Sequence, residues 1–190
     1  VSNLTLAGGR NVGLLSTVYS EATVSDLHLH DVHIETAGSN QRGIAALAAC
    51  NRGTVTDCSA VVEMRVLGDG STYCVAGLVG VNEGGDVSRC SARLSLVYQH
   101  VGSRGPRYYC AGLVGHNTGT ISQCHASAYT NSEISRFAGL VGQNDGSITD
   151  CHADGHLSGD LAAGLVHLNS GSITNCYAAT AVSDSEAGAG

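Results

Sequence analysis

The amino-acid sequence predicts an all-β protein that folds as a right-handed parallel β-helix, a solenoid of about six rungs. Three observations support this prediction: a short motif returns along the chain, turn residues occupy the same place in each copy, and no segment shows helical periodicity. Of the 190 residues, 43% are hydrophobic but only 4% are aromatic, with no Trp and one Phe. The core must therefore be thin and filled by small aliphatic side chains and Cys, as in stacked short strands.

The repeated unit reads CAGLVGHNTGTISQCHA where it begins at Cys110. Similar copies begin at Val75, Phe137 and Ala162, and a weaker one begins at Ile44. Unequal intervals between the copies indicate that each unit carries one connection of variable length. Together with a divergent first copy, the repeats of this single domain (residues 1–190) lie near residues 12–34, 44–62, 75–96, 110–128, 137–157 and 162–182.

Each unit contains short β patterns joined by turns. In the copy at 110–128, GLVG is expected to form a buried apolar strand, and the segment 117–119 (Asn-Thr-Gly) supplies turn residues that tolerate positive φ. The next segment, 120–122, alternates polar and apolar residues, which predicts a strand with Ile121 facing inward. Gln123 is then expected to make a bend, and Cys-x-Ala begins a third inward-facing stretch.

Stacking of the copies is required because one unit cannot bury its apolar face alone. With a rise of about 4.8 Å per rung, identical residues should form ladders along the axis. The Asn of each turn forms one such ladder, in which side-chain amides can bond from rung to rung. Its members are Asn51, Asn82, Asn117, Asn144 and Asn169. We interpret this ladder as structural and not as a binding site.

The pattern AGLVGxNxGxIxxCxA resembles the GLUG motif, a short repeat of bacterial surface proteins. It occurs in IgA1-specific metallopeptidases and in large haemagglutinin-like adhesins. The N-terminal segment NLTLAGGRNVGLL also resembles the start of such an array, so the resemblance covers nearly the whole chain. The resemblance implies a β-helical scaffold and gives no activity, because a fold does not determine a function.

Eight Cys residues raise the question of a disulfide framework. Five share one repeat position that Leu27 fills in the first copy, which indicates an apolar core site: Cys58, Cys90, Cys124, Cys151 and Cys176. A stack of free thiols is the favoured interpretation, with disulfides and a metal site as alternatives. Cys50, Cys74 and Cys110 lie outside this column. Cys74 and Cys110 precede successive AGLVG segments one residue out of register, so a bridge between them remains open.

The charge of the chain excludes some partners. The net charge is −7, and all nine positive residues are Arg. This balance disfavours nucleic acid and anionic membrane surfaces as partners. No apolar run approaches the roughly 20 residues of a membrane span, so no membrane insertion is expected.

Enzyme signatures are also missing from the sequence. No His is followed by Glu, so the HExxH zinc-protease motif is absent, and no serine-protease GDSG segment occurs. Polysaccharide-cleaving β-helices need clustered carboxylates. In the column of bend residues only the first two acids are neighbours; it reads Asp26, Asp57, Arg89, Gln123, Asp150 and Asn175. The prediction is therefore no enzyme, no catalytic residues and no cofactor.

His125 and His152 occupy one column on adjacent rungs, about 5 Å apart, where two His could chelate a divalent metal. The same column holds Ser59, Ser91 and Tyr177 in other copies, which is typical of an exposed surface position. We therefore predict surface histidines and no metal site.

The variable connections are the favoured place for recognition, because binding residues concentrate on loops carried by a rigid scaffold. All of them should leave the solenoid at one corner and lie on one side. The longest, LSLVYQHVGSRGPRYYCAG, is rich in Tyr and Arg, which dominate binding hot spots. The candidate ligand-binding residues there and in the preceding connection are Tyr73, Tyr98, His100, Arg104, Arg107, Tyr108 and Tyr109. They favour a host glycan or a host protein as the ligand.

The leading hypothesis is a non-catalytic structural or adhesive module of a bacterial surface or secreted protein, located extracellularly or on the cell surface. The last residues, EAGAG, resemble the start of another copy, so we expect a piece of a longer polypeptide whose flanking domains are its partners. The alternative is an accessory, substrate-positioning domain of an IgA1-protease-like metallopeptidase. A third hypothesis is an ice-binding face made of the outward Thr and Ser columns.

Overall fold

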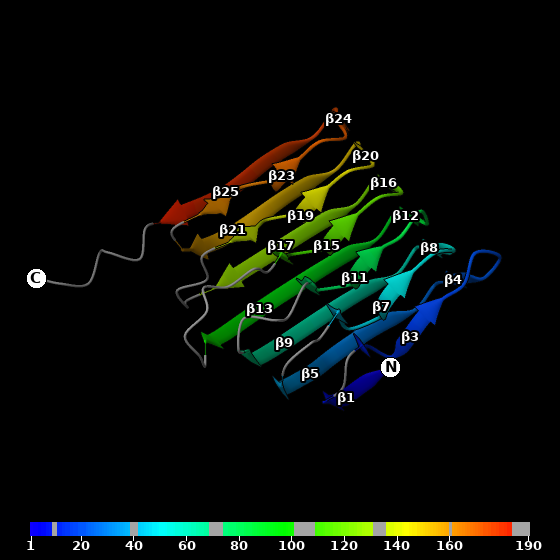
Figure 1. Ribbon diagram of the computed structural model, residues 1–190, viewed down its shortest axis with the longest axis vertical. Coiled ribbons are helices and arrows are strands. Elements are labelled where there is room, and N and C mark those ends of the chain that lie inside the picture. The colour runs from blue at the N-terminus through cyan, green and yellow to red at the C-terminus, as the bar shows by residue number, and fades with distance from the viewer. Residues whose placement is uncertain are drawn as a thin grey trace, which may run out of the picture.

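The computed structural model describes residues 1–8, 11–38, 42–68, 74–100, 109–130, 136–159 and 161–183. Within these ranges every regular element is a β-strand, and every strand pair is parallel. The strands form four parallel sheets, which we call A to D, and each sheet takes one strand from every coil. The colour changes steadily from blue to red from coil to coil along the axis (Figure 1). Successive coils therefore follow one another in sequence order, as the repeats predict. None of the described residues forms a helix long and apolar enough to cross a membrane.

Each coil passes through sheets B, C, D and A in that order. The strands of sheet A are β1 (Ser2–Ala7), β5 (His28–Gly38), β9 (Ser59–Gly68), β13 (Ser91–His100), β17 (His125–Thr130), β21 (His152–Ser158) and β25 (Tyr177–Ser183). Those of sheet B are β2 (Asn11–Val12), β6 (Gly43–Ile44), β10 (Cys74–Ala76), β14 (Tyr109–Ala111), β18 (Phe137–Ala138) and β22 (Ala162–Ala163).

Sheets C and D are built from the short strands that follow. Sheet C contains β3 (Leu15–Val18), β7 (Ala48–Asn51), β11 (Val79–Asn82), β15 (Val114–Asn117), β19 (Val141–Asn144) and β23 (Val166–Asn169). Sheet D contains β4 (Thr23–Ser25), β8 (Thr54–Thr56), β12 (Asp86–Ser88), β16 (Thr120–Ser122), β20 (Ser147–Thr149) and β24 (Ser172–Thr174). In the described part of the chain, sheets B, C and D have six strands each and sheet A has seven, which agrees with the expectation of about six rungs.

The GLVG segment departs from its sequence-based prediction. We expected one buried strand, but β14 ends at Ala111 and β15 begins at Val114, so Gly112 and Leu113 turn the corner between sheets B and C. The coil-to-coil hydrogen bonds continue through this corner, because Leu113 N–H and Val114 N–H both donate to the carbonyl of Leu140, at 3.0 and 3.2 Å. The Leu113 side chain is fully buried. The motif therefore encodes a buried corner and not a straight strand.

The polar bend column is confirmed at the corner between sheets D and A. All six predicted residues adopt a left-handed backbone with φ between 49° and 55°. Asp, Asn and Gln occupy most of these positions, and Asp and Asn accept this conformation more readily than other non-Gly residues. Arg89 is the exception, and its guanidinium donates to both carboxylate oxygens of Asp57 in the preceding coil, at 2.7 and 2.8 Å.

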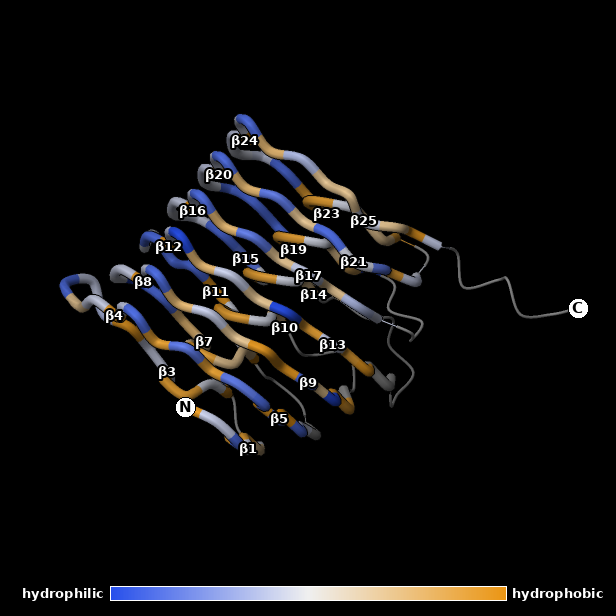
Figure 2. Tube along the Cα trace, turned by 180° about the vertical axis from the view of Figure 1, so that it is seen from behind, coloured by the Kyte–Doolittle hydropathy of each residue, from blue (hydrophilic) through white to orange (hydrophobic). Residues whose placement is uncertain are grey.

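The core runs along the axis between the sheets. The alternation of hydrophobic and hydrophilic residues along the strands is visible in Figure 2. Ile121 and Ile148 of sheet D are buried, as predicted, and Phe137, the one fully buried aromatic ring among the described side chains, lies in the core. The equivalent Ile173 in β24 is 37% exposed, because no described strand covers the last coil.

The Asn ladder is confirmed in detail. Asn51, Asn82, Asn117 and Asn144 are fully buried, and each side-chain amide donates to the Oδ1 of the Asn in the next coil at 2.7–2.8 Å. The ladder ends at Asn169, whose amide donates to the carbonyl of Gly171. Each Asn also binds the backbone of its own turn, which satisfies polar groups that are cut off from water.

The Cys column stacks as predicted. The backbone N–H of each column Cys from Cys58 to Cys151 donates to the Sγ of the Cys in the next coil, at 3.3–3.4 Å. All eight cysteines of the chain are free thiols. Val75 pairs with Cys110 and Cys74 pairs with Tyr109, which confirms the one-residue offset of Cys74 and Cys110. These two thiols are free as well.

Thiol accessibility should divide the cysteines into two groups. Cys50 and Cys176 are half-buried and the other six are buried. Burial raises the pKa of Cys74 to about 12 and also raises the pKa of Cys110, which keeps both as unreactive thiols. A disulfide reagent that releases a coloured thiolate should therefore reach only Cys50 and Cys176 in the native protein, and it should react with them slowly because the pKa of both thiols is raised; every Cys should react after denaturation. Rapid native reaction of the buried column would contradict this packing.

Candidate binding pocket on sheets B and C

The predicted ligand-binding loop falls mostly outside the described residues. Tyr73, Arg104, Arg107 and Tyr108 lie outside them, whereas Tyr98 and His100 end strand β13 with only their backbone described. Tyr109 begins β14 and is half-buried. Its ring lies 6.3 Å from the ring of His116, centroid to centroid. The loop as a binding site thus stays a prediction, with Tyr109 as its described anchor.

All variable connections share one corner of the solenoid. Each of them joins a strand of sheet A to the following strand of sheet B, as β13 to β14 and β17 to β18 do. The strands of each sheet are parallel and in register, so these connections start along one edge of sheet A and end along one edge of sheet B. This order agrees with the expectation that the connections leave from one side.

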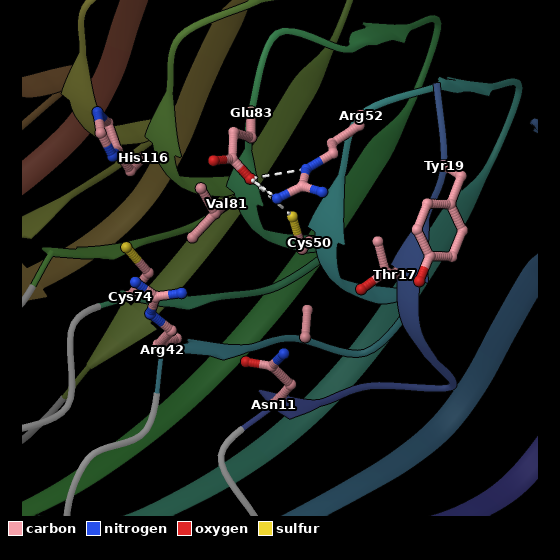
Figure 3. A pocket seen from close by; sticks show the side chains of 11 residues that line it. Asn11, Thr17, Tyr19, Arg42, Cys50, Arg52, Cys74, Val81, Glu83 and His116 are labelled. Atoms are coloured by element: carbon pink, nitrogen blue, oxygen red, sulfur yellow. Dashed lines mark hydrogen bonds and ion pairs between the residues drawn. The ribbon is translucent and has the colours of Figure 1, made fainter. Parts of the chain in front are cut away.

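A pocket of about 590 Å³ lies on the outer surface beside that corner (Figure 3). Its wall is formed by outward residues of sheet C, which stack in register as Thr17, Cys50, Val81 and His116. These side chains face outward because the next residue of each strand points into the core, as Asn in β7, β11 and β15.

An ion pair borders the pocket at the turn after sheet C. Arg52 and Glu83 follow the ladder Asn of two adjacent coils, and Arg52 donates through Nε and Nη2 to Oε2 of Glu83 at 2.9 and 2.8 Å. The Cys50 thiol donates to the same oxygen at 3.5 Å. Hydrogen bonding from Arg52 lowers the pKa of Glu83, so this side chain is a carboxylate at neutral pH. Within the described part of the chain, Oε1 of Glu83 has no hydrogen-bond partner.

Cys50 is a poor nucleophile in this setting. Burial, followed by the hydrogen bond to the Glu83 carboxylate, raises the pKa of the Cys50 thiol. A thiol beside a carboxylate stays protonated, and the protonated form is weakly reactive.

His116 is held at the far end of the pocket. A hydrogen bond of 2.7 Å joins its Nε2 to Oδ2 of Asp145 in the next coil, and Gln143 Nε2 donates to the same oxygen at 2.8 Å. Hydrogen bonds from Ser170, His116 and Gln143, in this order, lower the pKa of Asp145. This network orients the imidazole and occupies one of its two nitrogens.

Arg42 is the second cation of the pocket. It precedes β6, and its exposed guanidinium lies beside Cys74, across the pocket from the Arg52–Glu83 pair (Figure 3). No carboxylate of the described residues lies within ion-pair distance of Arg42. Its charge nevertheless acts on the pocket, where it lowers the pKa values of Cys50 and Glu83 as a smaller contribution.

The coil that contains Glu83 is also the part of the chain that matches a known motif. Residues 71–95 match the GLUG motif. This GLUG repeat contains β10, β11 and β12 and the first residues of β13, one passage through all four sheets. No curated protein and no solved structure matches the chain.

The repeat pattern of the chain explains why sequence reasoning missed the pocket. Arg42, Cys50, Arg52 and Glu83 occupy outward or turn positions that the repeat leaves free to vary, so no motif marks them. The available signal is positional. The residue after each ladder Asn must lie next to its counterpart in the adjacent coil, which places Arg52 opposite Glu83.

The predicted surface histidines are stacked and not arranged around a common point. The His125 and His152 rings lie 4.2 Å apart at 18°, and Tyr177 continues the stack at 4.9 Å. His125 also contacts Asp154, at 3.1 Å. In the described ranges, no group of three or more His, Cys, Asp or Glu is placed to hold a metal ion.

Proposed function

We propose that this chain is a non-catalytic adhesive module of a bacterial surface or secreted protein, in which GLUG repeats form the scaffold and one corner carries the ligand-binding residues. The observation that carries the proposal is the common origin of the variable connections beside the pocket on sheets B and C. A rigid scaffold with recognition residues at one edge is a usual design for binding proteins. We further propose an extracellular or cell-surface location, with flanking domains of the same polypeptide and a host glycan or protein as partners.

The chemistry of the pocket supports binding in preference to catalysis. Glycoside hydrolysis needs two carboxyl groups on opposite sides of the scissile bond. Glu83 is the one carboxylate among the described lining residues, and its pairing with Arg52 keeps it ionised and unsuited to donate a proton. Cys50, a thiol whose pKa is raised by burial and by the Glu83 carboxylate, is a poor nucleophile.

The regular scaffold supports the adhesive role as well. From the second coil on, every coil repeats the same Asn and Cys columns, and the sheets therefore hold successive connections at a constant separation of about 4.8 Å along the axis. Binding loops on such a support lose little conformational entropy when they engage a ligand, because their ends are already fixed.

A binding screen with a connection exchange tests this proposal. The chain is immobilised and probed with a glycan array and a panel of host extracellular-matrix proteins. Replacement of residues 101–108 by the shorter natural connection 131–135 should abolish the binding found, and the double variant Tyr108→Ala/Tyr109→Ala should weaken it by at least about tenfold.

Tyr129→Ala is the matched control, because Tyr129 is 41% exposed on β17, in sheet A. This variant should bind like the unmodified chain. Unchanged binding after the connection exchange, or no binding to any member of either panel, would contradict an adhesive role for this corner.

A further inference from the structure

We propose that the pocket on sheets B and C binds a carboxylated sugar unit of a glycan, with Arg42 as the residue that recognises the carboxylate. This inference rests on the proposed adhesive function and names the ligand class for one described site. The size of the pocket, its charge and its free hydrogen-bonding groups support this ligand class.

The pocket has the size of a small-molecule site. Its volume of about 590 Å³ lies within the range of roughly 300–1,000 Å³ typical of ligand pockets and far exceeds the space that a single ion needs. The walls come from strands of four successive coils, β3, β7, β11 and β15. A site built on such strands is held in place before a ligand arrives.

The charge of the pocket is opposite to that of the chain. The net charge of the whole sequence is −7, yet two of its nine cations, Arg42 and Arg52, line this one pocket. Glu83 neutralises Arg52 through its two short hydrogen bonds, whereas no described carboxylate neutralises Arg42. The pocket therefore carries one uncompensated guanidinium, which favours an anionic ligand, and the planar donor pair of Arg fits a carboxylate in two-point contact.

Glu83 selects a singly charged anion. A phosphate monoester, which carries close to two negative charges at neutral pH, would meet stronger repulsion from this carboxylate, which is ionised at neutral pH. A carboxylated sugar places its one charge at Arg42 and its hydroxyl groups elsewhere. Oε1 of Glu83 has no partner among the described residues and can accept a hydrogen bond from a sugar hydroxyl.

The remaining lining groups fit a sugar ring. Thr17 and Asn11 bring neutral hydrogen-bonding side chains, and Tyr19 offers a ring that is 67% exposed at the edge of the pocket (Figure 3). Aromatic rings cover the apolar C–H face of a sugar, while polar groups bind its hydroxyls.

Calorimetric titration of the 190-residue chain tests the assignment. The probes are glucuronic acid, N-acetylneuraminic acid, glucuronic acid methyl ester, glucose and inorganic phosphate. At least one of the two acids should bind, and the methyl ester and glucose should bind at least about tenfold more weakly because the charge–guanidinium contact is lost. Arg42→Met should weaken binding of the acid by a similar factor.

Arg93→Met is the matched control, because Arg93 is an exposed Arg on β13 in sheet A whose guanidinium lies over the ring of Tyr129. It should leave binding unchanged, and equal denaturation midpoints will show that both variants are folded. Equal binding of acid and methyl ester, an unaffected Arg42→Met variant, stronger binding of phosphate, or no binding of either acid would each overturn the assignment.

Failure of this assignment can be separated from failure of the adhesive role. If the chain binds in the glycan or matrix-protein screen but neither acid binds the pocket, the ligand class is wrong and the adhesive function stands. If the chain binds nothing in the screen and no acid in titration, both proposals fall.

Discussion

Gly112→Ala is expected to reduce the free energy of unfolding by about 3 kcal/mol or more, because the corner between sheets B and C has no room for a methyl group. A Cβ at this position would lie 2.1 Å from the carbonyl oxygen of Gly139 and 2.9 Å from the Cβ of Ala126. The first neighbour is backbone of the adjacent coil, which can move only if the stacking of the two coils changes. Urea denaturation followed by circular dichroism measures the loss.

Gly164→Ala is the matched control for this prediction. Gly164 occupies the same repeat position in the last coil, where the nearest atom to an added Cβ is the Cβ of Ala178 at 3.3 Å. Neither glycine has the left-handed backbone that would strain any side chain, so the two substitutions differ in space alone. The control should change the stability by less than about 1 kcal/mol. Equal effects of the two substitutions would show that the backbone of the adjacent coil can move away from the methyl group without loss of stability.

Asn117→Ala is expected to lower the free energy of unfolding by about 2–4 kcal/mol, because it interrupts the buried ladder on both sides. Asn117 accepts from Asn82 and donates to Asn144, both at 2.8 Å, and its Oδ1 accepts from Gly119 N–H at 3.2 Å. Alanine leaves the Asn144 Oδ1 without its donor and removes one acceptor from the Asn82 amide. Since both neighbours are fully buried, water cannot replace the lost partners.

The end of the ladder provides the comparison. Asn169 accepts from Asn144 and donates only to the carbonyl of Gly171, and it is exposed. Asn169→Ala should therefore cost about 1 kcal/mol or less in the same denaturation experiment. Hydrogen exchange should show faster amide exchange around 117–119 in Asn117→Ala. A cost at Asn117 no larger than that at Asn169 would mean that the ladder contributes no more inside the core than at its end.

The repeat made most of the fold predictable. Once the copies were aligned, the Asn column, the Cys column and the left-handed bend residues from Asp26 to Asn175 followed from their common position. Each of these assignments needs only the rule that equivalent residues of adjacent coils stack. The corner at Gly112 and Leu113 was not predictable in this way, since a short apolar run looks the same whether it forms a strand or turns a corner.

The candidate site was less accessible to sequence reasoning. The Tyr- and Arg-rich connection was predicted as a binding loop because it is long and differs in composition from the repeats. Arg42, Arg52 and Glu83 were not predicted as site residues, because each is an ordinary charged residue on its own. Whether these three side chains line one pocket, and which of them form an ion pair, depends on which coils are adjacent in the structure.

By itself, the sequence determined the parallel β-helix and its Asn, Cys and bend ladders, because those properties depend on positions that recur along the chain. The tertiary structure decided the rest. It placed Arg52 against Glu83 at 2.8 Å, left Arg42 without a described carboxylate partner, and brought four coils together around one pocket. Such contacts join residues that are about 30 positions apart in the sequence but lie in adjacent coils, about 4.8 Å apart along the axis. Because the coils differ in length, the sequence separation does not show which side chains meet, and only the stacked structure does.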